Sequence, residues 1–287
     1  EQHIHFVGIG GIGMSGIAEV LLNLKYPVSG SDLKRSSTVT RLRRLGAKVY
    51  IGHKEKNVAD VDVMVVSSAV NKSNPEVMRA HKLGIPVIQR AEMLAELIRL
   101  VKYGIAVAGT HGKTTTTSLM ASVLQTAKID PTVIIGGKVK SLRSNARLGK
   151  GDFIITEADE SDGSFLKLLP TIAVVTNIDH EHLDHYGSFK NCVNAFQTFC
   201  SRIPFYGVSI LCGEDKETAA LSERLKKRHQ LYGLSKKHDW NAQDIDYQGA
   251  QSSFDVYKKE EFQARVIVNL PGKHNVLNAL AVVAVAD

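Results

Sequence analysis

The segment that most constrains the fold of this chain lies between residues 104 and 127. An apolar run at residues 104–108 leads into Gly109-Thr110-His111-Gly112-Lys113-Thr114, and a run with helical periodicity follows. A strand, a glycine loop ending in Gly-Lys-Thr and a helix are the parts of a phosphate-binding loop, whose backbone N–H groups surround the phosphates. Lys113 is predicted to reach the β- and γ-phosphates, and the Thr114 hydroxyl to bind Mg²⁺. The first glycine of the usual pattern would fall at Val107, so the match to that pattern is incomplete.

The rest of the chain also alternates between short apolar strands and helices, which favours an α/β fold with parallel sheets. Strands are predicted at residues 3–7, 27–31, 48–50, 61–67, 86–88, 104–108, 131–135, 153–157, 172–176 and 207–212. Helices are predicted at residues 16–24, 37–45, 75–83, 91–102, 114–127, 191–199, 218–227 and 275–286. Residues 240–257 and 263–270 alternate as strands of an antiparallel edge do. The pattern restarts after the helix at 91–102, so we predict two domains, residues 1–98 and 99–287.

Another glycine-rich loop follows the first predicted strand. Residues 8–13 read Gly-Ile-Gly-Gly-Ile-Gly, which is G-x-G-x-x-G between a strand and a helix. The glycines allow a tight turn, and the N-terminus of the helix offers free N–H groups to a diphosphate. Asp32 ends the next strand, where an acid would meet a ribose, but it can equally serve as a cap or turn residue. This motif alone does not separate NAD from another diphosphate ligand, or from a turn without a ligand.

Acidic and imidazole side chains follow two later strands. The strand at 153–157 delivers Glu157, and three further acids stand within the next five residues. Like charges at that density favour a bound cation, with a solvated acidic loop as the alternative. The strand at 172–176 is followed by three histidines and three acids within residues 179–185. Such side chains can complete a metal site, although the spacing does not decide which of them bind a metal.

Composition argues against several other classes of protein. No run approaches the roughly 18 apolar residues of a membrane span, and no basic segment followed by an apolar stretch indicates secretion. Three cysteines are too few and too scattered for a disulfide framework or a zinc site, which favours a reducing, cytoplasmic compartment. The formal net charge of +7 suits anionic ligands, but no basic run with interleaved aromatic residues suggests nucleic acid. We therefore expect no membrane and no nucleic acid among the partners.

Together these segments resemble the Mur ligase family of peptidoglycan synthesis, and the resemblance covers the whole chain. The family's own form of the phosphate loop matches residues 109–114 and accounts for the missing glycine at Val107. Residues 157–162 (EADESD), 176–182 (TNIDHEH) and 271–279 (PGKHNVLNA) match the family in order. Within the family, residues 7–18 (VGIGGIGMSGIA) most resemble the branch that joins L-alanine to UDP-N-acetylmuramate.

The resemblance implies a Rossmann-like N-terminal domain that holds a UDP-sugar, followed by a P-loop mononucleotide-binding α/β central domain. A third, C-terminal Rossmann-like domain is expected to be absent from these residues, so they are expected to bind ligands but to ligate little. In the implied reaction, ATP phosphorylates the muramoyl carboxylate, and the amine of L-alanine displaces phosphate as the amide forms. The implied cofactors are ATP and Mg²⁺, and the implied partners are UDP-N-acetylmuramate, L-alanine and ATP, for a cytoplasmic monomer or homodimer.

The resemblance also implies roles for individual residues. The catalytic residues would be Lys113, Glu157 and His182. Thr114 and Glu157 would hold one metal ion, and His182 would help to hold a second. The ATP-binding residues would be Gly109, Thr110, His111, Gly112, Lys113, Thr114, Thr115, Asn275 and Asn278, although Asn275 could instead cap a helix. The UDP-sugar-binding residues would be Gly10, Gly11, Ile12, Gly13, Met14, Ser15, Asp32, His53, Ser68, Arg90 and Asn145.

Two other functions remain open at this point. One is the family's recycling branch, which adds a preformed tripeptide to the same sugar nucleotide. The other is a P-loop kinase or NTPase with an accessory dinucleotide-binding domain. The ligand of the first glycine loop separates the second from a ligase, because that alternative requires NAD there instead of a UDP-sugar.

Overall fold

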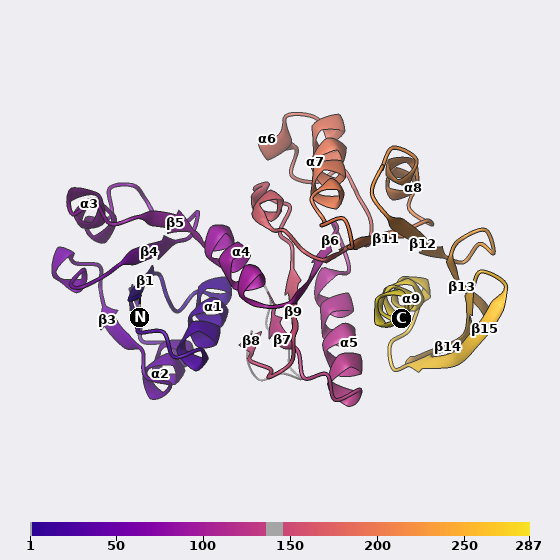
Figure 1. Cartoon of the computed structure of the whole chain (residues 1–287), viewed down its shortest axis with the longest axis horizontal. Helices are drawn as coiled ribbons and strands as arrows, with labels where there is room; N and C mark the ends of the chain where they lie inside the picture. Colours follow the sequence, from indigo (N-terminus) through magenta and orange to yellow (C-terminus); the bar gives the residue numbers. More distant parts are fainter. Residues whose placement is uncertain (1, 136–145) are drawn as a thin grey trace. The chain divides into compact units, whose positions relative to one another are not determined.

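The computed structural model describes residues 2–135 and 146–287. The chain divides into two compact units, one formed by Glu1–Leu100 with Thr132–Lys150 and the other by Val101–Pro131 with Gly151–Asp287. Both units alternate strands with helices, which confirms the predicted α/β class (Figure 1). The domain limits at residues 98 and 99 stay a prediction, because compactness alone does not define a domain. Within the described residues, no helix is both long and apolar enough to cross a membrane.

The first unit contains a parallel sheet with the strand order β3-β2-β1-β4-β5. Its strands are β1 (Ile4–Val7), β2 (Val28–Asp32), β3 (Lys48–Ile51), β4 (Val63–Val66) and β5 (Val87–Gln89). Its helices are α1 (Ile12–Asn23), α2 (Ser37–Arg44), α3 (Pro75–Lys82) and α4 (Arg90–Leu100), with a short 3-10 helix η1 (Glu55–Asn57). The strand order reverses direction between β1 and β4. The glycine loop after β1 therefore lies at the switch point where open α/β sheets bind ligands.

Local sequence explains how α3 begins and how β1 and β2 come together. The Asn74 side chain accepts a hydrogen bond from the backbone N–H of Glu76 at 2.9 Å, and Pro75 follows as the first helical residue. Both features stabilise a helix start, since Asn satisfies a free N–H and Pro lacks one. In β2, a Cβ atom at Gly30 would lie 2.6 Å from the carbonyl oxygen of Phe6, so only glycine fits there.

The second unit is built on strands in the order β15-β14-β13-β12-β11-β10-β6-β9. Neighbours from β9 to β13 pair in parallel, and β13, β14 and β15 form an antiparallel meander. The strands are β6 (Tyr103–Ala108), β9 (Phe153–Glu157), β10 (Ile172–Val175), β11 (Val208–Cys212), β12 (His229–Gly233), β13 (Trp240–Gln248), β14 (Gln251–Lys258) and β15 (Glu261–Val268). The helices are α5 (Lys113–Thr126), α6 (Leu183–Tyr186), α7 (Phe189–Ser201), α8 (Lys216–Ser222) and α9 (Lys273–Ala286), with a 3-10 helix η2 (Ser164–Lys167). Two further strands of the chain, β7 (Thr132–Ile134) and β8 (Ala146–Arg147), pair antiparallel with each other.

Helix α9 brings the end of the chain back to the phosphate loop. It packs against strands β11 to β14 and against α5, as Figure 1 shows. On another part of this unit, the ring of Phe165 in η2 lies 5.1 Å from the rings of both Phe196 and Phe199 in α7. These three side chains are fully buried. Their packing fixes the segment that connects the acidic loop after β9 to the rest of the unit.

The structure corrects several predicted element boundaries. Helix α1 begins at Ile12 instead of residue 16, because Gly11 takes the N-cap position and Met14 and Ser15 are buried within the helix. Residues 240–257, predicted as one stretch, form the hairpin β13–β14, whose turn contains Gly249 at φ +59°. The helix predicted at 218–227 spans Lys216–Ser222. Strand β12 and the single-turn helix α6 were not predicted, since both are short and rich in polar residues.

Candidate nucleotide-binding site

The loop from β6 to α5 has the backbone of a phosphate-binding loop. Gly109 has φ +132°, and a Cβ atom there would collide with the Thr176 hydroxyl. Gly112 is the N-cap of α5 at φ +87°, and its Cβ would lie 2.8 Å from Oδ1 of Asn278. Residues that carry a side chain rarely adopt such backbone angles, so both positions require glycine. Val107, where the usual pattern has its first glycine, is instead a fully buried residue of β6.

The segment after β10 holds the phosphate loop from the other side. The Thr176 hydroxyl donates to the carbonyl oxygen of His111 at 2.6 Å, and Nδ2 of Asn177 donates to the same oxygen at 2.9 Å. Oδ1 of Asn177 accepts from the backbone N–H of His111 at 2.8 Å. The backbone N–H of Asp179 donates to the Thr110 hydroxyl at 2.9 Å. Both peptide groups of His111 are therefore fixed before any ligand binds, which preorganises the loop.

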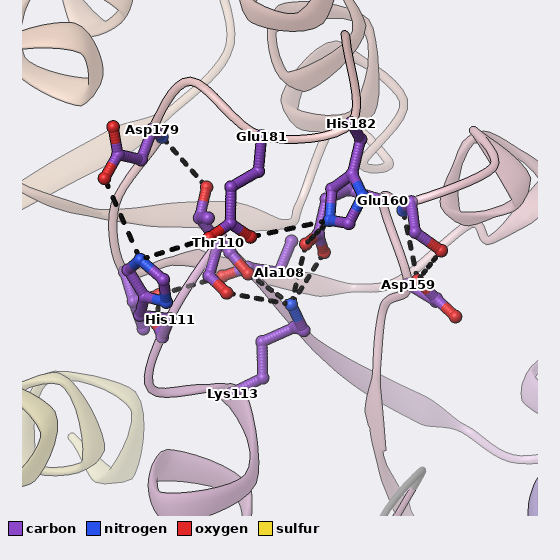
Figure 2. Close-up of polar contacts among 12 residues, drawn as sticks. Ala108, Thr110, His111, Lys113, Asp159, Glu160, Asp179, Glu181 and His182 are labelled. Carbon is purple, nitrogen blue, oxygen red and sulfur yellow. Dashed lines mark hydrogen bonds and ion pairs between the residues drawn. The ribbon is translucent and has the colours of Figure 1, made fainter. Parts of the chain in front are cut away.

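Lys113, Glu160 and His182 meet at the carboxyl edge of the sheet (Figure 2). Nζ of Lys113 donates to both carboxylate oxygens of Glu160, each at 2.8 Å, and to the carbonyl oxygen of Gly109 at 2.5 Å. Nε2 of His182 lies 3.6 Å from Oε1 of Glu160 and 3.7 Å from Oε2 of Glu181. His182 adopts a left-handed backbone at φ +58° as the N-cap of α6. The carboxylate that meets both predicted catalytic side chains is thus Glu160, three residues after Glu157.

Burial strongly affects the charge of this cluster. Desolvation raises the pKa of Glu160 above 4.5, and the hydrogen bonds and charge of Lys113 oppose that rise. The side chain of Glu160 is only 3% exposed, whereas that of Lys113 is 19% exposed. The hydroxyl of Tyr186 donates to the backbone carbonyl of Glu160 at 2.5 Å, and burial raises the pKa of that phenol well above 10. Lys113 therefore partly offsets the cost of burying a carboxylate beside the phosphate loop.

The other predicted metal-binding residues lie at the same edge of the sheet. Glu157 is the last residue of β9 and stands in register with Val107 of β6. Thr114 is an exposed residue in the first turn of α5. Within residues 2–135 and 146–287, no three His, Cys, Asp or Glu side chains form a ready metal site. The residues still fit Mg²⁺, because a P-loop magnesium takes one hydroxyl, one carboxylate and phosphate oxygens rather than a protein cage.

Asn275 and Asn278 stand in the first turns of α9, and each is 7% exposed. Nδ2 of Asn275 donates to the carbonyl oxygen of Pro271 at 2.7 Å, so this side chain supports the start of the helix. Asn278 faces Gly112, the N-cap of α5. The structure therefore brings Asn278 to the phosphate loop. Asn275 does not cap α9, because the N-cap is Gly272, which has no side-chain cap hydrogen bond, and Asn275 lies inside the helix.

In the first unit, the side-chain carboxylate of Asp32 is hydrogen-bonded to the first glycine loop. The backbone N–H of Gly10 donates to Oδ2 of Asp32 at 2.8 Å, and Oδ1 accepts from the N–H of Lys34 at 3.1 Å. A Cβ atom at Gly13 would lie 2.5 Å from Nη1 of Arg90, which places that guanidinium against the first turn of α1. The structure thus brings Asp32 and Arg90 to the loop, and their binding of a UDP-sugar stays a prediction. Asp32 also serves as a turn residue, the alternative left open by its sequence context.

The other residues predicted to bind the UDP-sugar are spread over several elements of the first unit. Gly11 caps α1, and Ile12, Gly13, Met14 and Ser15 form its first turn instead of an extended loop. Nδ1 of His53, which follows β3, lies 2.7 Å from the hydroxyl of Ser31 in β2. Ser68 is exposed in the turn after β4. Asn145 lies outside the described residues.

Several residues that support the predicted ones carry no distinguishing pattern in the sequence. Glu160 was one of four acids in its segment, and nothing in their spacing distinguished it from Glu157. Thr176 and Asn177 were noted only as part of a matching stretch, although they carry the contacts that fix the loop. Glu76, a fully buried carboxylate in the first unit, gave no signal except its polar character after Pro75.

Comparison with known proteins identifies the family. Residues 3–102 match the Mur ligase family, catalytic domain, and residues 107–286 match the Mur ligase middle domain. The chain is 57% identical over 286 residues to the UDP-N-acetylmuramate–L-alanine ligase of Sorangium cellulosum, covering 100% of this chain and 61% of the relative. It is 59% identical to the enzyme of that name from Geobacter sulfurreducens, covering 99% of this chain and 62% of the relative. The chain thus spans about three fifths of the length of these curated relatives.

Comparison with solved structures points to the same family. The UDP-N-acetylmuramate-alanine ligase of Thermotoga maritima is 32% identical with a TM-score of 0.84, over 99% of this chain and 64% of that one. The UDP-N-acetylmuramate:L-alanyl-γ-D-glutamyl-meso-diaminopimelate ligase of Neisseria meningitides is 30% identical with a TM-score of 0.88, over 99% of this chain and 93% of that one. With both of its units matched in sequence and in fold, the chain belongs to the Mur ligase family.

Proposed function

We propose that the protein containing these residues is an ATP-dependent ligase that joins L-alanine to the carboxylate of UDP-N-acetylmuramate, in cytoplasmic peptidoglycan precursor synthesis. The observation that carries this proposal is the phosphate loop with Lys113 held by Glu160 beside His182. The proposal is further supported by the sequence identity of 57% and 59% between this chain and enzymes named for that reaction. Mg²⁺ is the proposed cofactor, and ATP and L-alanine are the proposed co-substrates.

The proposed reaction transfers the γ-phosphoryl group of ATP to the muramoyl carboxylate, and the amine of L-alanine then displaces phosphate from the acyl phosphate. The chain's own residues position ATP and neutralise its charge. The N–H groups of the loop and Nζ of Lys113 hold the phosphates. Glu160 keeps Lys113 directed across the loop and supports His182. A magnesium ion held by Thr114 and Glu157, with His182 near a second ion, would further neutralise the phosphate oxygens.

In the first unit, the proposed ligand is the UDP part of the sugar nucleotide. The N-terminus of α1, with Gly10 and Gly11 before it, offers backbone N–H groups to the diphosphate. Arg90, against Gly13, adds positive charge to that position. Asp32 is already a hydrogen-bond acceptor for Gly10, so it is available to a ribose hydroxyl only beside that contact.

A second candidate is the ligation of a preformed peptide to the same sugar nucleotide. The observation in its favour is the fold similarity to the Neisseria meningitides enzyme named for that reaction, with a TM-score of 0.88. The sequence identity of 30% is lower than the 57% and 59% to the alanine-adding enzymes, so alanine remains the first choice.

Binding measurements with the 287-residue chain test the proposal. Titration calorimetry should show binding of UDP-N-acetylmuramate and of a non-hydrolysable ATP analogue with Mg²⁺, and none of NADH. Lys113→Ala should abolish binding of the ATP analogue and leave the binding isotherm of the UDP-sugar unchanged. Tight binding of NADH without binding of the UDP-sugar would overturn the ligase assignment in favour of a nucleotide-binding kinase or NTPase.

Product analysis tests the choice of amino acid. The natural protein that contains these residues is incubated with UDP-N-acetylmuramate, ATP, Mg²⁺ and either L-alanine or the tripeptide, and the acid-quenched products are weighed by mass spectrometry. We expect the L-alanyl product. Turnover of the tripeptide alone would replace the alanine assignment with the recycling reaction.

A further inference from the structure

A row of buried polar side chains crosses one face of the first sheet. His5 in β1 and Ser29 and Ser31 in β2 are each fully buried, and so is Glu76 in the first turn of α3. The same face is apolar nearby, where Val7 and Met64 pack against Val77 and Ala80 of α3. Burying polar groups lowers stability unless each finds a partner. These side chains therefore need hydrogen-bond partners within the protein, and their burial calls for a functional explanation.

Glu76 is the centre of the row and has partners from three different segments: β1, β2 and residues 52–57. Its Oε2 accepts from the Ser31 hydroxyl at 2.5 Å and lies 3.3 Å from Nδ1 of His53 and 3.7 Å from Nε2 of His5. Its Oε1 accepts from Nδ2 of Asn57 at 2.5 Å and from the backbone N–H of Lys54 at 3.4 Å.

These partners decide the ionisation of the carboxyl group. Burial raises the pKa of Glu76, but the nearby ring of His5 and the hydrogen bonds from Ser31 and Asn57 outweigh burial and hold that pKa below 4.5. The carboxylate is therefore ionised at neutral pH although no solvent reaches it.

Hydrogen bonds connect the segments that contact Glu76 to the first glycine loop. The carbonyl oxygen of Ser31 accepts from the N–H groups of Gly8 and Ile9 at 2.8 and 3.0 Å. The N–H of Gly52, next to His53, donates to the carbonyl oxygen of Asp32 at 2.8 Å. His53 thus sits at the carboxyl edge of β2 and β3, beside the loop proposed to hold a diphosphate.

The contacts of His53 leave one side of its ring available. Nδ1 is engaged by Ser31 and Glu76, and the side chain is 18% exposed. Among residues 2–135 and 146–287, no hydrogen bond or ion pair occupies Nε2. Because the two nitrogens lie on opposite sides of the ring, fastening Nδ1 directs Nε2 away from Glu76. A ring protonated at both nitrogens would donate from Nδ1 to Ser31 or Glu76 and from Nε2 to an anion.

We propose that Glu76 is a positioning residue for the UDP-sugar site: it fixes His53 so that Nε2 meets the diphosphate of a nucleoside diphosphate sugar. It also holds the 52–57 segment in shape through Lys54 and Asn57. The proposal rests on the UDP-sugar function proposed for the first unit. Replacing all members of a buried ionic cluster by well-packed apolar side chains often leaves stability equal or higher, so stability alone does not explain why this cluster is present.

The test is a double-mutant cycle read by titration calorimetry with UDP-N-acetylmuramate. Glu76→Gln has nearly the same shape but loses the charge that fixes His53. A hydrogen bond to a charged group is commonly worth enough to change affinity about tenfold or more, so we expect at least that rise in Kd. His53→Ala should cause a similar rise, and the double variant should be no weaker than His53→Ala alone. Affinity for the ATP analogue, which binds the second unit, should not change in any of them.

Two further variants complete the test. Glu55→Gln, an exposed carboxylate in the same 52–57 segment, is the matched control and should leave Kd unchanged. If Glu76→Gln does not fold, Ser31→Ala replaces it and should weaken binding only when His53 is present. Additive losses from Glu76 and His53, or no loss from Glu76→Gln, would overturn the positioning role while leaving the UDP-sugar function intact. Failure of the unmodified chain to bind the UDP-sugar would overturn the proposed function itself, and this inference with it.

Discussion

Replacing Lys113 with methionine should destabilise the protein even when no nucleotide is present. A phosphate-loop lysine is normally expected to affect ligand binding rather than folding. Here its Nζ is 2.8 Å from both carboxylate oxygens of Glu160, whose side chain is 3% exposed. Methionine has a similar volume but offers no charge and no donor, so the variant leaves a buried carboxylate without its cation.

The size of the effect follows from the geometry. At 2.8 Å and an effective dielectric constant of about 20, the direct attraction between the two charges is about 6 kcal/mol before desolvation is counted. Removing one partner of a buried pair typically costs about 3–5 kcal/mol, and the 19% exposure of Lys113 favours the lower end, about 3 kcal/mol. Glu160→Gln in the same variant should recover about 1–2 kcal/mol, because it removes the uncompensated charge.

Urea unfolding followed by Trp240 fluorescence measures this directly. Trp240 is the only tryptophan, is 1% exposed and lies in the second unit, so it reports on the unit that contains Lys113. Lys236→Met, at an exposed lysine of the same unit, is the control and should change the free energy of unfolding by less than about 0.5 kcal/mol.

The pH dependence has a definite sign. Burial raises the pKa of Glu160 even with Lys113 present, and without Lys113 the opposing effect is lost. The folded variant then binds a proton more readily than the unfolded chain, so its stability should fall as pH rises. A loss below 1 kcal/mol for Lys113→Met, or no recovery in the double variant, would refute this reasoning.

Three other predictions follow from the same contacts. Gly109→Ala should lower the free energy of unfolding of the second unit by at least about 2 kcal/mol and abolish binding of the ATP analogue. The reason is that Gly109 has φ +132° and the Thr176 hydroxyl leaves no room for a Cβ atom. The control Gly187→Ala, at φ +70° in open space, should lower the free energy of unfolding by only about 1 kcal/mol in the same fluorescence assay. The three buried cysteines should not react with Ellman's reagent until the protein is unfolded, since burial raises the pKa of Cys200 to about 12 and raises those of Cys192 and Cys212. Because the pKa of Glu76 is held below 4.5, its contribution is present above that pH and lost as pH falls, so acid titrations followed by circular dichroism should show a shallower loss of stability for Glu76→Gln.

The sequence by itself determined the class of fold and the place of both glycine loops. Apolar runs such as residues 104–108 and 172–176 predict buried parallel strands, and glycines at their ends predict tight turns, because both signals depend only on neighbours in the chain. The predicted phosphate loop and the strand that delivers Glu157 were found as expected. Helix α1 began earlier than predicted, since burial against the sheet outweighs the low helix propensity of Gly13.

Only the tertiary structure decided which of several equivalent polar residues act together. Glu157 and Glu160 are both acids of one short segment, and the packing of that segment, rather than its composition, brings Glu160 to Lys113. Glu76 and His53 are 23 residues apart, and parallel pairing of β1, β2 and β3 under α3 joins them. Contacts of this kind depend on strand order and on which face of the sheet a side chain takes. A pattern along the chain records neither unless the partner strands are already known.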